Sequence, residues 1–466
     1  MKRYLAFDFG AESGRAIVGT LDNGKLTLEE IHRFPNIPVR LNTGLYWDVL
    51  RLFHEVQHAM HIVGRERQYT ISGIGVDTWG VDFGLLSSDG ALLDNPRLYR
   101  DSRNDGTVEK ICEAAGKENI FSQTGIQFMQ INSLCQLYAS KLAGTESLKQ
   151  AVHLLFIPDL FNYWLTGVMR AEVTIASTSQ FYNPAERRWA TELLDTLGLP
   201  KQILPELIQP GEELGKLLPW LALESGLGEI PVYTSAGHDT ASAVVAVPAE
   251  GDNWCYISSG TWSLMGVEID EPILTKEALA MNITNEIGYG GKVRLLKNIM
   301  GLWLVQECRR TWLAQGHNYS YEELTDMAAA AETGIAVIDV DAFLHPGHMP
   351  EKIAAWCRAH SQRVPHTPGE FVRVILESLA IRYNQVLEGI EKLTGKRIDV
   401  IHIVGGGSKN KLLNSLVVKA TGRRVIAGPV EGTAIGNLLV QALGAGDIGS
   451  LAEARVIVRN SFDVQE

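Results

Sequence analysis

The sequence has few cysteines, and their spacing indicates neither a disulfide framework nor a zinc site. The five are widely scattered, odd in number and without a C-x-x-C pair: Cys112, Cys135, Cys255, Cys308 and Cys357. Such a distribution is typical of reduced, mostly buried thiols in a protein of the cytosol. We therefore expect a cytoplasmic protein.

Long hydrophobic runs are also missing. The N-terminal segment MKRYLAFDFG begins with positive charge, but Asp8 interrupts its apolar run. No later run approaches the roughly 18 apolar residues that a membrane-spanning helix requires. The sequence predicts no membrane segment and no membrane partner.

Positive charge is in short supply, since the formal net charge is −12 and no dense stripe of Lys and Arg is present. A protein with this charge gains nothing from counterion release on DNA, which argues against nucleic acid as a partner. A substrate that carries phosphate stays possible, because backbone N–H groups and a bound cation hold phosphate locally.

Several catalytic motifs are absent as well. The sequence contains no G-x-x-x-x-G-K-[ST], no H-E-x-x-H and no G-x-S-x-G, which argues against a Walker-type P-loop, zinc chemistry and a hydrolase nucleophile elbow. The segment VGGGSKN at 404–410 lacks the third glycine of a dinucleotide fingerprint and lies far from the N-terminus. It is a weak candidate for a dinucleotide site.

What the sequence does contain is one layout used twice. Residues 4–21 and 253–269 each place a short Gly/Ser/Thr turn between two apolar strands. In the first, Leu5, Phe7 and Phe9 share one face and Asp8 points to the other. The repeat indicates a duplicated domain, although two unrelated hairpins would look the same.

Strands and helices alternate after each hairpin. ISGIGVD (71–77) and IDVIHIVGGG (398–407) read as buried strands. Before the latter, Thr367-Pro368 with Glu370 predicts a helix start with a capping box, and Gly395 predicts its end. The apolar stripe of this helix is core: Val372, Ile375, Leu379, Tyr383, Val386, Ile390 and Leu393.

This alternation predicts two mainly α/β domains. The boundary is expected near residue 245, after AGHDTASAVVAVP, which gives domains 1–245 and 246–466. Ordinary globular composition, with 45% hydrophobic residues in 466, agrees with two domains.

Two acids have positions suited to chemistry. Asp8, on the polar face of its strand, could hold Mg²⁺ directly or through water, or serve as a hydrogen-bonded structural acid. Asp239, in SAGHDTASAVVAV, follows a strand and opens an apolar helix. It could be the helix N-cap, the base that accepts a hydroxyl proton in phosphoryl transfer, or both. His238 by itself favours a structural hydrogen-bonding role.

A third cluster has side chains of the kind that bind carbohydrate. DTWGVDF (77–83) surrounds Trp79 with acids, and LYRDSRN (98–104) adds Asp101 and Arg103. Paired donors and acceptors beside an aromatic ring suit a sugar; a surface turn with an ion pair is the alternative. We expect Asp77, Trp79, Asp101 and Arg103 to line a sugar site.

The order of these motifs resembles that of the rhamnulokinases, in the carbohydrate kinase family that also contains glycerol kinase and xylulokinase. The blocks that carry the resemblance run from Tyr4 to about Gly446: FDFGAESGR, GVDTWGVDF, YRDSR, GIQF, PDLFNYWLTG, GHDTASAV, SSGTWSLMG, KNIMGLWL, HIVGGG and VIAGPVEGTAIGN. The last twenty residues match no pattern.

The resemblance implies two ribonuclease-H-like domains of the actin-like ATPase type, with the active site in a cleft between them, the sugar on the N-terminal domain and the nucleotide on the C-terminal one. Asp239 would be the catalytic base, and Asp8 would assist Mg²⁺. Sugar contacts would come from Gly80, His238, Thr240 and Asn298. Contacts to ATP would come from Ala11, Glu12, Ser13, Gly14, Arg15, Thr261, Gln306 and the loop Gly405, Gly406 and Gly407.

The expected reaction is the ATP-dependent phosphorylation of the 1-hydroxyl of L-rhamnulose, in rhamnose breakdown, by a monomer or homodimer. Three alternatives stay open: a kinase for another ketose or polyol such as L-fuculose or L-xylulose, an actin- or chaperone-like ATPase that acts on no sugar, and a catalytically silent sugar sensor.

Overall fold

The protein divides into two compact units, each discontinuous in sequence. The computed structural model describes residues 1–465. Unit 1 comprises Met1–Pro248, Glu268–Leu295 and Gly432–Phe462, and unit 2 comprises Ala249–Val267, Leu296–Glu431 and Asp463–Glu466.

Unit 1 is built on a mixed six-stranded sheet in which a hairpin is extended by parallel strands. The strands, in spatial order, are β13 (Glu213–Lys216), β14 (Pro231–Tyr233), β6 (Gly73–Thr78), β1 (Lys2–Phe9), β2 (Ser13–Asp22) and β3 (Lys25–Pro35). β1 pairs antiparallel with β2 and parallel with β6, which in turn lies parallel to β14. The apolar side chains of β1 are fully buried, which explains why this strand lies in the middle of the sheet.

Unit 2 repeats this arrangement. Its strands include, in spatial order, β16 (Trp262–Ile269), β15 (Trp254–Ser259), β19 (Val400–Val404) and β20 (Arg424–Ala427). β15 pairs antiparallel with β16 and parallel with β19, and β19 lies parallel to β20. The repeated hairpin predicted from the sequence is therefore the start of two sheets with the same topology.

The remaining elements connect these strands. In unit 1 the helices are α1 (Val49–His61), η1 (Ile62–Glu66), η2 (Ser102–Asn104), α2 (Thr107–Ala115), α3 (Lys117–Thr124), α4 (Ser133–Ala143), α5 (Glu146–Gln150), α6 (Ile157–Thr166), α7 (Val173–Ala176), η3 (Ser177–Ser179), α8 (Thr191–Leu197), η4 (Lys201–Ile203), α9 (Pro219–Ser225), α10 (Asp239–Val245), α11 (Lys276–Ala280), η5 (Tyr289–Gly291), α17 (Gly432–Gly444) and α18 (Leu451–Ser461). The short strands of this unit are β4 (Val39–Leu41), β5 (Gly44–Tyr46), β7 (Phe83–Leu86), β8 (His153–Phe156), β9 (Ala171–Glu172), β10 (Tyr182–Asn183), β11 (Arg188–Trp189), β12 (Leu207–Ile208) and β17 (Thr284–Ile287). β18 (Val293–Met300) runs from unit 1 into unit 2, whose helices are α12 (Trp303–Ala314), α13 (Tyr321–Ala330), η6 (Val340–Ala342), α14 (Met349–Ala359), α15 (Pro368–Thr394), η7 (Gly406–Lys409) and α16 (Lys411–Thr421).

The long helix α15 begins and ends where the sequence predicts. The Thr367 hydroxyl accepts a hydrogen bond from the Glu370 N–H, the Glu370 carboxylate accepts one from the Thr367 N–H, and Pro368 occupies the first turn. Gly395 closes the helix with φ 67°, a left-handed conformation that glycine adopts without strain. The apolar stripe from Val372 to Ile390 is buried, which confirms its role as core.

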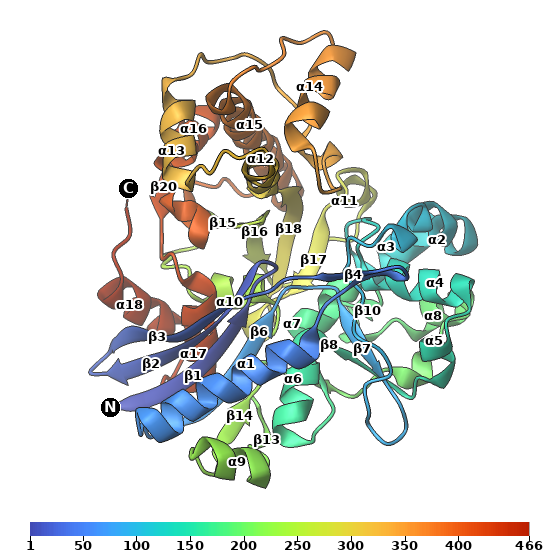
Figure 1. The fold of residues 1–466 in the computed structure, drawn as a ribbon, viewed down its shortest axis with the longest axis vertical. Helices are drawn as coiled ribbons and strands as arrows, with labels where there is room; N and C mark the ends of the chain where they lie inside the picture. The colour runs from blue at the N-terminus through green and yellow to red at the C-terminus, as the bar shows by residue number, and fades with distance from the viewer. Residues whose placement is uncertain (466) are drawn as a thin grey trace. The chain divides into compact units, whose positions relative to one another are not determined.

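The last helices of the chain belong to unit 1 rather than to unit 2. In Figure 1, α17 lies beside β1 and α10, and these pairs are in contact. The approach to α10 is close, because a Cβ added at Gly436 would lie 1.7 Å from the Ser242 carbonyl oxygen. By compactness, residues 268–295 and 432–462 group with the N-terminal segment in unit 1. The division of the chain into domains 1–245 and 246–466 stays a prediction.

Burial of the cysteines agrees with the sequence analysis, since all except the half-buried Cys112 lie in the interior. No helix within residues 1–465 combines the length and apolar character needed to span a lipid bilayer.

Candidate active site

Two carboxylates occupy neighbouring positions at the carboxyl ends of parallel strands in unit 1. Asp8 on β1 is in register with Asp77 on β6, so both side chains lie on the same face of the sheet. Arg15, opposite Asp8 on β2, donates a hydrogen bond to Asp8 Oδ2. Asp77 is fully buried and accepts a hydrogen bond of 2.6 Å from Asn437 on α17.

A third carboxylate, Asp239, stands at the junction between β14 and α10. The backbone beside it is tied to the end of β6, because the Thr78 N–H donates to the Gly237 carbonyl over 2.9 Å. Asp239 Oδ1 accepts hydrogen bonds from the Thr240 N–H at 2.5 Å and the Thr240 hydroxyl at 3.1 Å, and lies 3.3 Å from His238 Nε2. The N-cap of α10 is His238, so the prediction that Asp239 is the N-cap is wrong.

The Asp239 side chain is 30% exposed, which makes its carboxylate accessible in unit 1. Among the described residues, nothing donates a hydrogen bond to its second oxygen, Oδ2. Burial raises the pKa of Asp239, the His238 ring opposes this shift, and the negative charge of Asp8 adds to it. Burial and the charges of Asp8 and Asp239 also raise the pKa of Asp77, while the hydrogen bond from Asn437 opposes the shift. The charge of Asp8 therefore affects the pKa of both Asp77 and Asp239, and the charge of Asp239 also affects that of Asp77.

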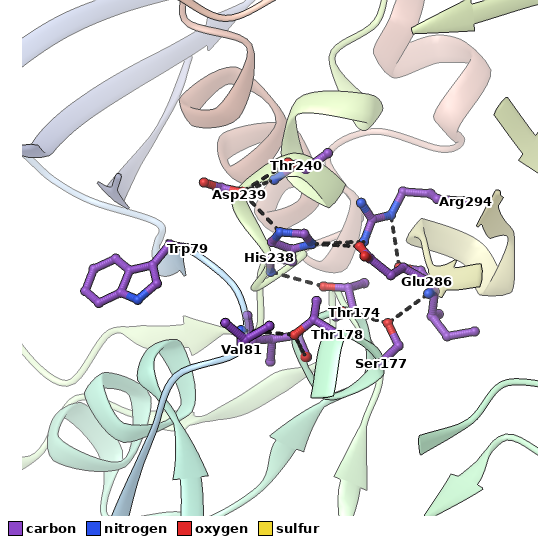
Figure 2. Close-up of polar contacts among 12 residues, drawn as sticks. Trp79, Val81, Thr174, Ser177, Thr178, His238, Asp239, Thr240, Glu286 and Arg294 are labelled. Atoms are coloured by element: carbon purple, nitrogen blue, oxygen red, sulfur yellow. Dashed lines mark hydrogen bonds and ion pairs between the residues drawn. The ribbon is translucent and has the colours of Figure 1, made fainter. Parts of the chain in front are cut away.

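The loop after β6 approaches His238 closely. A Cβ added at Gly80 would lie 3.3 Å from His238 Nε2 and 3.4 Å from the Thr178 side chain, so only glycine leaves this space open. Val81 follows with φ 68°, which is unusual for a β-branched residue. Hydrogen bonds from the Val81 N–H to the Thr178 hydroxyl, at 3.1 Å, and from the Ser133 hydroxyl to the Val81 carbonyl hold it there. Figure 2 shows Val81 beside Thr178. Val81 was not among the predicted site residues, because its positive φ leaves no mark in the sequence of this loop.

Trp79, predicted to offer a ring to a sugar, is largely buried in unit 1. Its indole N–H donates a hydrogen bond of 2.9 Å to Asp82, which also accepts one of 2.6 Å from Trp47 and one of 2.8 Å from Gln136. Burial raises the pKa of Asp82 to about 6, and these donors hold it from rising further. The acid of DTWGVDF that organises the loop is thus Asp82.

Asp101 and Arg103 are also engaged within the protein. Asp101 accepts hydrogen bonds from the backbone N–H groups of Leu45 at 2.6 Å and Arg103 at 2.9 Å. Arg103 donates a hydrogen bond of 2.9 Å to Ser140 on α4. It borders a cavity of about 470 Å³ whose other lining residues come from 43–46, 83–97 and 140–150, a set that does not include Asp239.

A buried glutamate that the sequence analysis missed supports the junction before Asp239. Glu172, 1% exposed, accepts hydrogen bonds from the Gly237 N–H at 2.9 Å and from the N–H groups of Thr174 and Ile175. The Thr174 hydroxyl in turn accepts a hydrogen bond of 3.2 Å from the His238 N–H. The only sign of this role in the sequence is that an acidic residue directly precedes the apolar segment VTIA.

The turn of the first hairpin is short and held at both ends. The Gly10 N–H donates to the Ser13 carbonyl over 2.9 Å, and the Asn36 N–H donates to the Glu12 carbonyl over 2.9 Å. Gly14 is required by packing, because an added Cβ would lie 2.2 Å from the Phe34 ring. The side chains of Ala11, Glu12, Ser13 and Arg15 are half-buried.

In unit 2, the second hairpin turn is tied to the start of α12. The Leu302 N–H donates a hydrogen bond of 3.1 Å to the Gly260 carbonyl, and the Trp303 N–H donates one of 3.1 Å to the Thr261 carbonyl. Gln306 lies one turn into α12, and Asn298 is half-buried on β18.

The glycine loop after β19 packs on the end of β15, also in unit 2. A Cβ at Gly407 would lie 2.7 Å from Ser259 Cβ, and one at Gly405 would lie 3.0 Å from the Ser259 carbonyl oxygen. Gly405 also has φ 85°. A Cβ at Gly406 would meet nothing within 4 Å. Packing against β15 therefore explains why Gly405 and Gly407 are glycines, without a bound nucleotide.

The carboxylates of Asp8 and Asp77 are suited to a cation that takes its remaining ligands from other molecules. In the described residues, no group of three or more His, Cys, Asp or Glu side chains is arranged to hold a metal ion by itself. Asp77 Oδ1 is buried without a hydrogen-bond partner, and Asp8 lies beside it. One or two carboxylates with remaining ligands from water and phosphate is the usual arrangement for Mg²⁺, so these residues fit that ion.

The two sheets of one topology and the carboxylates at the strand ends define a two-domain α/β fold with the architecture of actin-like ATPases and sugar kinases. Solved structures confirm this fold: gluconate kinase from Lactobacillus acidophilus has a TM-score of 0.80 at 18% identity over 100% of this chain and 93% of that chain. Plasmodium falciparum glycerol kinase with ADP has a TM-score of 0.78 at 16% identity, with 100% and 94% covered.

The chain belongs to the FGGY family of carbohydrate kinases. The model of the family's N-terminal domain matches residues 3–246, and that of its C-terminal domain matches residues 255–445. The chain is 43% identical to a rhamnulokinase of Bacteroides thetaiotaomicron, over 100% of this chain and 95% of that protein. It is 40% identical to a rhamnulokinase of Bacillus subtilis, with 99% and 94% covered.

Proposed function

We propose that this protein phosphorylates the 1-hydroxyl of L-rhamnulose with ATP in the cytoplasm. The choice of substrate is supported by the two rhamnulokinases that are 43% and 40% identical to this chain over nearly its whole length. The observation that carries the chemistry is the partly exposed Asp239 carboxylate: Thr240 donates to one of its oxygens, and no residue within 1–465 donates to the other.

Asp239 acts as the general base in this proposal. Its free oxygen accepts the proton of the sugar hydroxyl as the hydroxyl oxygen bonds to the γ-phosphorus of ATP and ADP leaves. Phosphoryl transfer passes through a loose transition state, so the protein chiefly positions reactants and balances charge. A positioned base contributes about 10²–10⁴-fold to the rate.

The sugar is proposed to contact Gly80, His238 and Thr240 in unit 1 and Asn298 in unit 2. Gly80 suits this role because the space beside His238 stays open only without a side chain. Asp77, Trp79, Asp101 and Arg103 were assigned to the sugar site by side-chain type. Their contacts within the protein favour supporting roles, in which they hold the loops that face the substrate.

ATP is proposed to bind the backbone of the two hairpin turns, at residues 11–15 and Thr261, with Gln306 and the loop 405–407 at the nucleoside. Short turns present N–H groups to phosphate without obstruction by side chains. Mg²⁺, when bound, neutralises phosphate charge, and Asp8 is the residue proposed to hold it, with Asp77 beside it on the neighbouring strand.

An ADP-release assay with a panel of sugars tests the substrate. We expect turnover with L-rhamnulose and much lower kcat/KM with L-fuculose, L-xylulose and glycerol. ATP hydrolysis without sugar should be slow. A clear preference for another member of the panel, or ATPase activity independent of sugar, contradicts the proposal.

The variant Asp239→Asn tests the base. It keeps the size of the side chain and its contact with Thr240, but an amide accepts no proton near neutral pH. We expect kcat to fall by about 10²–10⁴-fold while the Kd for ATP stays within about threefold. Near-normal turnover would refute the role of Asp239.

A further inference from the structure

A buried ion pair in unit 1 lies against His238, and no role has so far been assigned to it. Glu286, on β17, is 3% exposed, and Arg294, at the start of β18, is 0% exposed. Arg294 Nη2 donates a hydrogen bond of 3.0 Å to Glu286 Oε2, and Arg294 Nε donates one of 3.2 Å to the Ile287 carbonyl. The guanidinium is therefore held in one orientation.

Both members of this pair lie close to the same ring nitrogen of His238. Nδ1 is 3.1 Å from Arg294 Nη2, a contact with hydrogen-bond geometry, and 3.2 Å from Glu286 Oε2. Figure 2 shows the imidazole between Asp239 on one side and the Glu286–Arg294 pair on the other. A guanidinium only donates hydrogen bonds and a carboxylate only accepts them, so the two neighbours favour opposite tautomers.

We propose that Arg294, balanced by Glu286, is a positioning residue that keeps Nδ1 of His238 unprotonated and the ring proton on Nε2. The contact between Arg294 Nη2 and Nδ1 has hydrogen-bond geometry, and a guanidinium can only donate, which makes Nδ1 the acceptor. The Glu286 oxygen nearest the ring is already engaged by Arg294 and lies 3.2 Å from Nδ1 as a charge contact. Because an arginine stays protonated at any pH of interest, Arg294 remains a hydrogen-bond donor to Nδ1 over that whole pH range.

The tautomer decides what His238 offers to a ligand. Nε2 faces Asp239 Oδ1, 3.3 Å away, and the open space beside Gly80. With the proton on Nε2, His238 is a neutral donor beside the accepting carboxylate of Asp239. Such a pair recognises two neighbouring oxygens of a ketose, one that accepts and one that donates. This use rests on the proposed function; the assignment of the tautomer does not.

The opposite tautomer would disable the pair. With the proton on Nδ1, the Nε2 lone pair would face the Asp239 carboxylate, and His238 would offer no donor to the sugar. Loss of a hydrogen bond to a polar substrate group corresponds to about 10- to 100-fold in kcat/KM.

The tautomer can be measured directly by ¹⁵N NMR of the full-length protein labelled in its histidines, with the His238 signals assigned through His238→Gln. We expect a protonated Nε2 and an unprotonated Nδ1 in the wild type. Arg294→Met leaves Glu286 as the only partner of Nδ1, so the proton should move to Nδ1. A wild-type spectrum with the proton on Nδ1, or an unchanged spectrum in R294M, overturns the proposal.

The double variant Glu286→Gln with Arg294→Met separates tautomer control from structural support. The amide introduced by E286Q can donate to Nδ1, so the proton should return to Nε2 although both charges are gone. We expect kcat/KM for L-rhamnulose to fall about 10- to 100-fold in R294M and to recover in the double variant to within about fivefold of wild type. If the ion pair only supports the fold, the double variant will be no better than R294M.

Arg373→Met provides the matched control, because it removes another buried arginine that is paired with a glutamate, Glu377, over 2.7 Å in α15. It should leave both the His238 spectrum and kcat/KM unchanged. If the wild type does not phosphorylate L-rhamnulose, the proposed function fails while the spectra still decide the tautomer. If R294M does not fold, the wild-type spectrum and the double variant decide it.

Discussion

At the scale of single residues, the environment of each carboxylate separates reactive groups from structural ones. Asp82 and Glu172 are saturated with N–H donors, and burial raises the pKa of each to about 6. Asp239 differs because no described residue donates to one of its oxygens and 30% of the side chain is exposed. Residue type alone did not distinguish these acids, since each follows or precedes an apolar segment in the sequence.

The acid limb of the pH–rate profile should report the carboxyl group of Asp239. Burial raises its pKa, so kcat should fall on acidification at a higher pH than for an ordinary aspartate, because the protonated form accepts no proton. The Thr240 hydroxyl opposes this shift. Thr240→Val should therefore raise the pKa further and move the acid limb of kcat to higher pH. A limb that moves to lower pH contradicts this assignment.

Two neighbouring buried acids should lose different amounts of stability when each is replaced by its neutral isostere. Glu172→Gln places an NH₂ group against backbone donors, and we expect a loss of about 2–3 kcal/mol of stability and lower kcat as the Gly237–His238 turn shifts. Burial and the neighbouring charge of Glu172 raise the pKa of Asp159 well above its ordinary value, which favours the neutral form that an amide resembles. Asp159→Asn should change stability by less than about 1 kcal/mol. Calorimetry of both variants checks the contrast, which equal losses would contradict.

At the scale of secondary-structure elements, glycines mark where one backbone passes close to another. The glycine loop after β19 was interpreted as a surface for nucleotide, yet Gly405 and Gly407 are needed for the approach to Ser259 on β15. Similarly, Gly14 makes room for Phe34. A sequence shows that such a residue is glycine but not which neighbour requires it.

The substitutions Gly407→Ala and Gly406→Ala form a matched pair in this loop. A Cβ at Gly407 would overlap Ser259, whereas a Cβ at Gly406 would meet no atom within 4 Å. We expect G407A to lower the Tm by several degrees and to raise the KM for ATP as the loop shifts. G406A should keep the wild-type Tm. Equal Tm values for the two variants would show that Ser259 does not restrict the loop.

At the scale of the whole molecule, the order of segments along the chain differs from their grouping in space. The hydrophobic core of unit 1 combines residues of β1 with residues of α10 and α17, including Tyr4, Ala241 and Leu438. Asn437 and Gln441 of α17 also donate hydrogen bonds to Asp77 and to the Leu5 carbonyl. The N-terminal segment of unit 1, which ends at Pro248, thus packs against a helix that begins only at Gly432.

A fragment of residues 1–248 tests this dependence. Without α17 and α18 it exposes the apolar face that covers β1 and α10, and leaves Asp77 buried without its amide donor. We expect no cooperative thermal transition for the fragment alone. A second fragment in which residues 432–462 follow through a flexible linker should regain one. Cooperative unfolding of 1–248 by itself would show that the unit does not require the returning helices.

The sequence by itself determined the two hairpins, the strand–helix alternation, the caps of α15 and the carboxylate at the head of α10, because hydrophobic periodicity and capping residues act over a few neighbours. Only the tertiary structure decided that α17 covers the first sheet, that Asp82 rather than Trp79 organises its loop, and that Glu172, Glu286 and Arg294 surround the His238 segment. Arg294 lies 56 residues from His238 and Asn437 lies 360 residues from Asp77 in sequence, and burial brings these partners together through packing that no local pattern encodes.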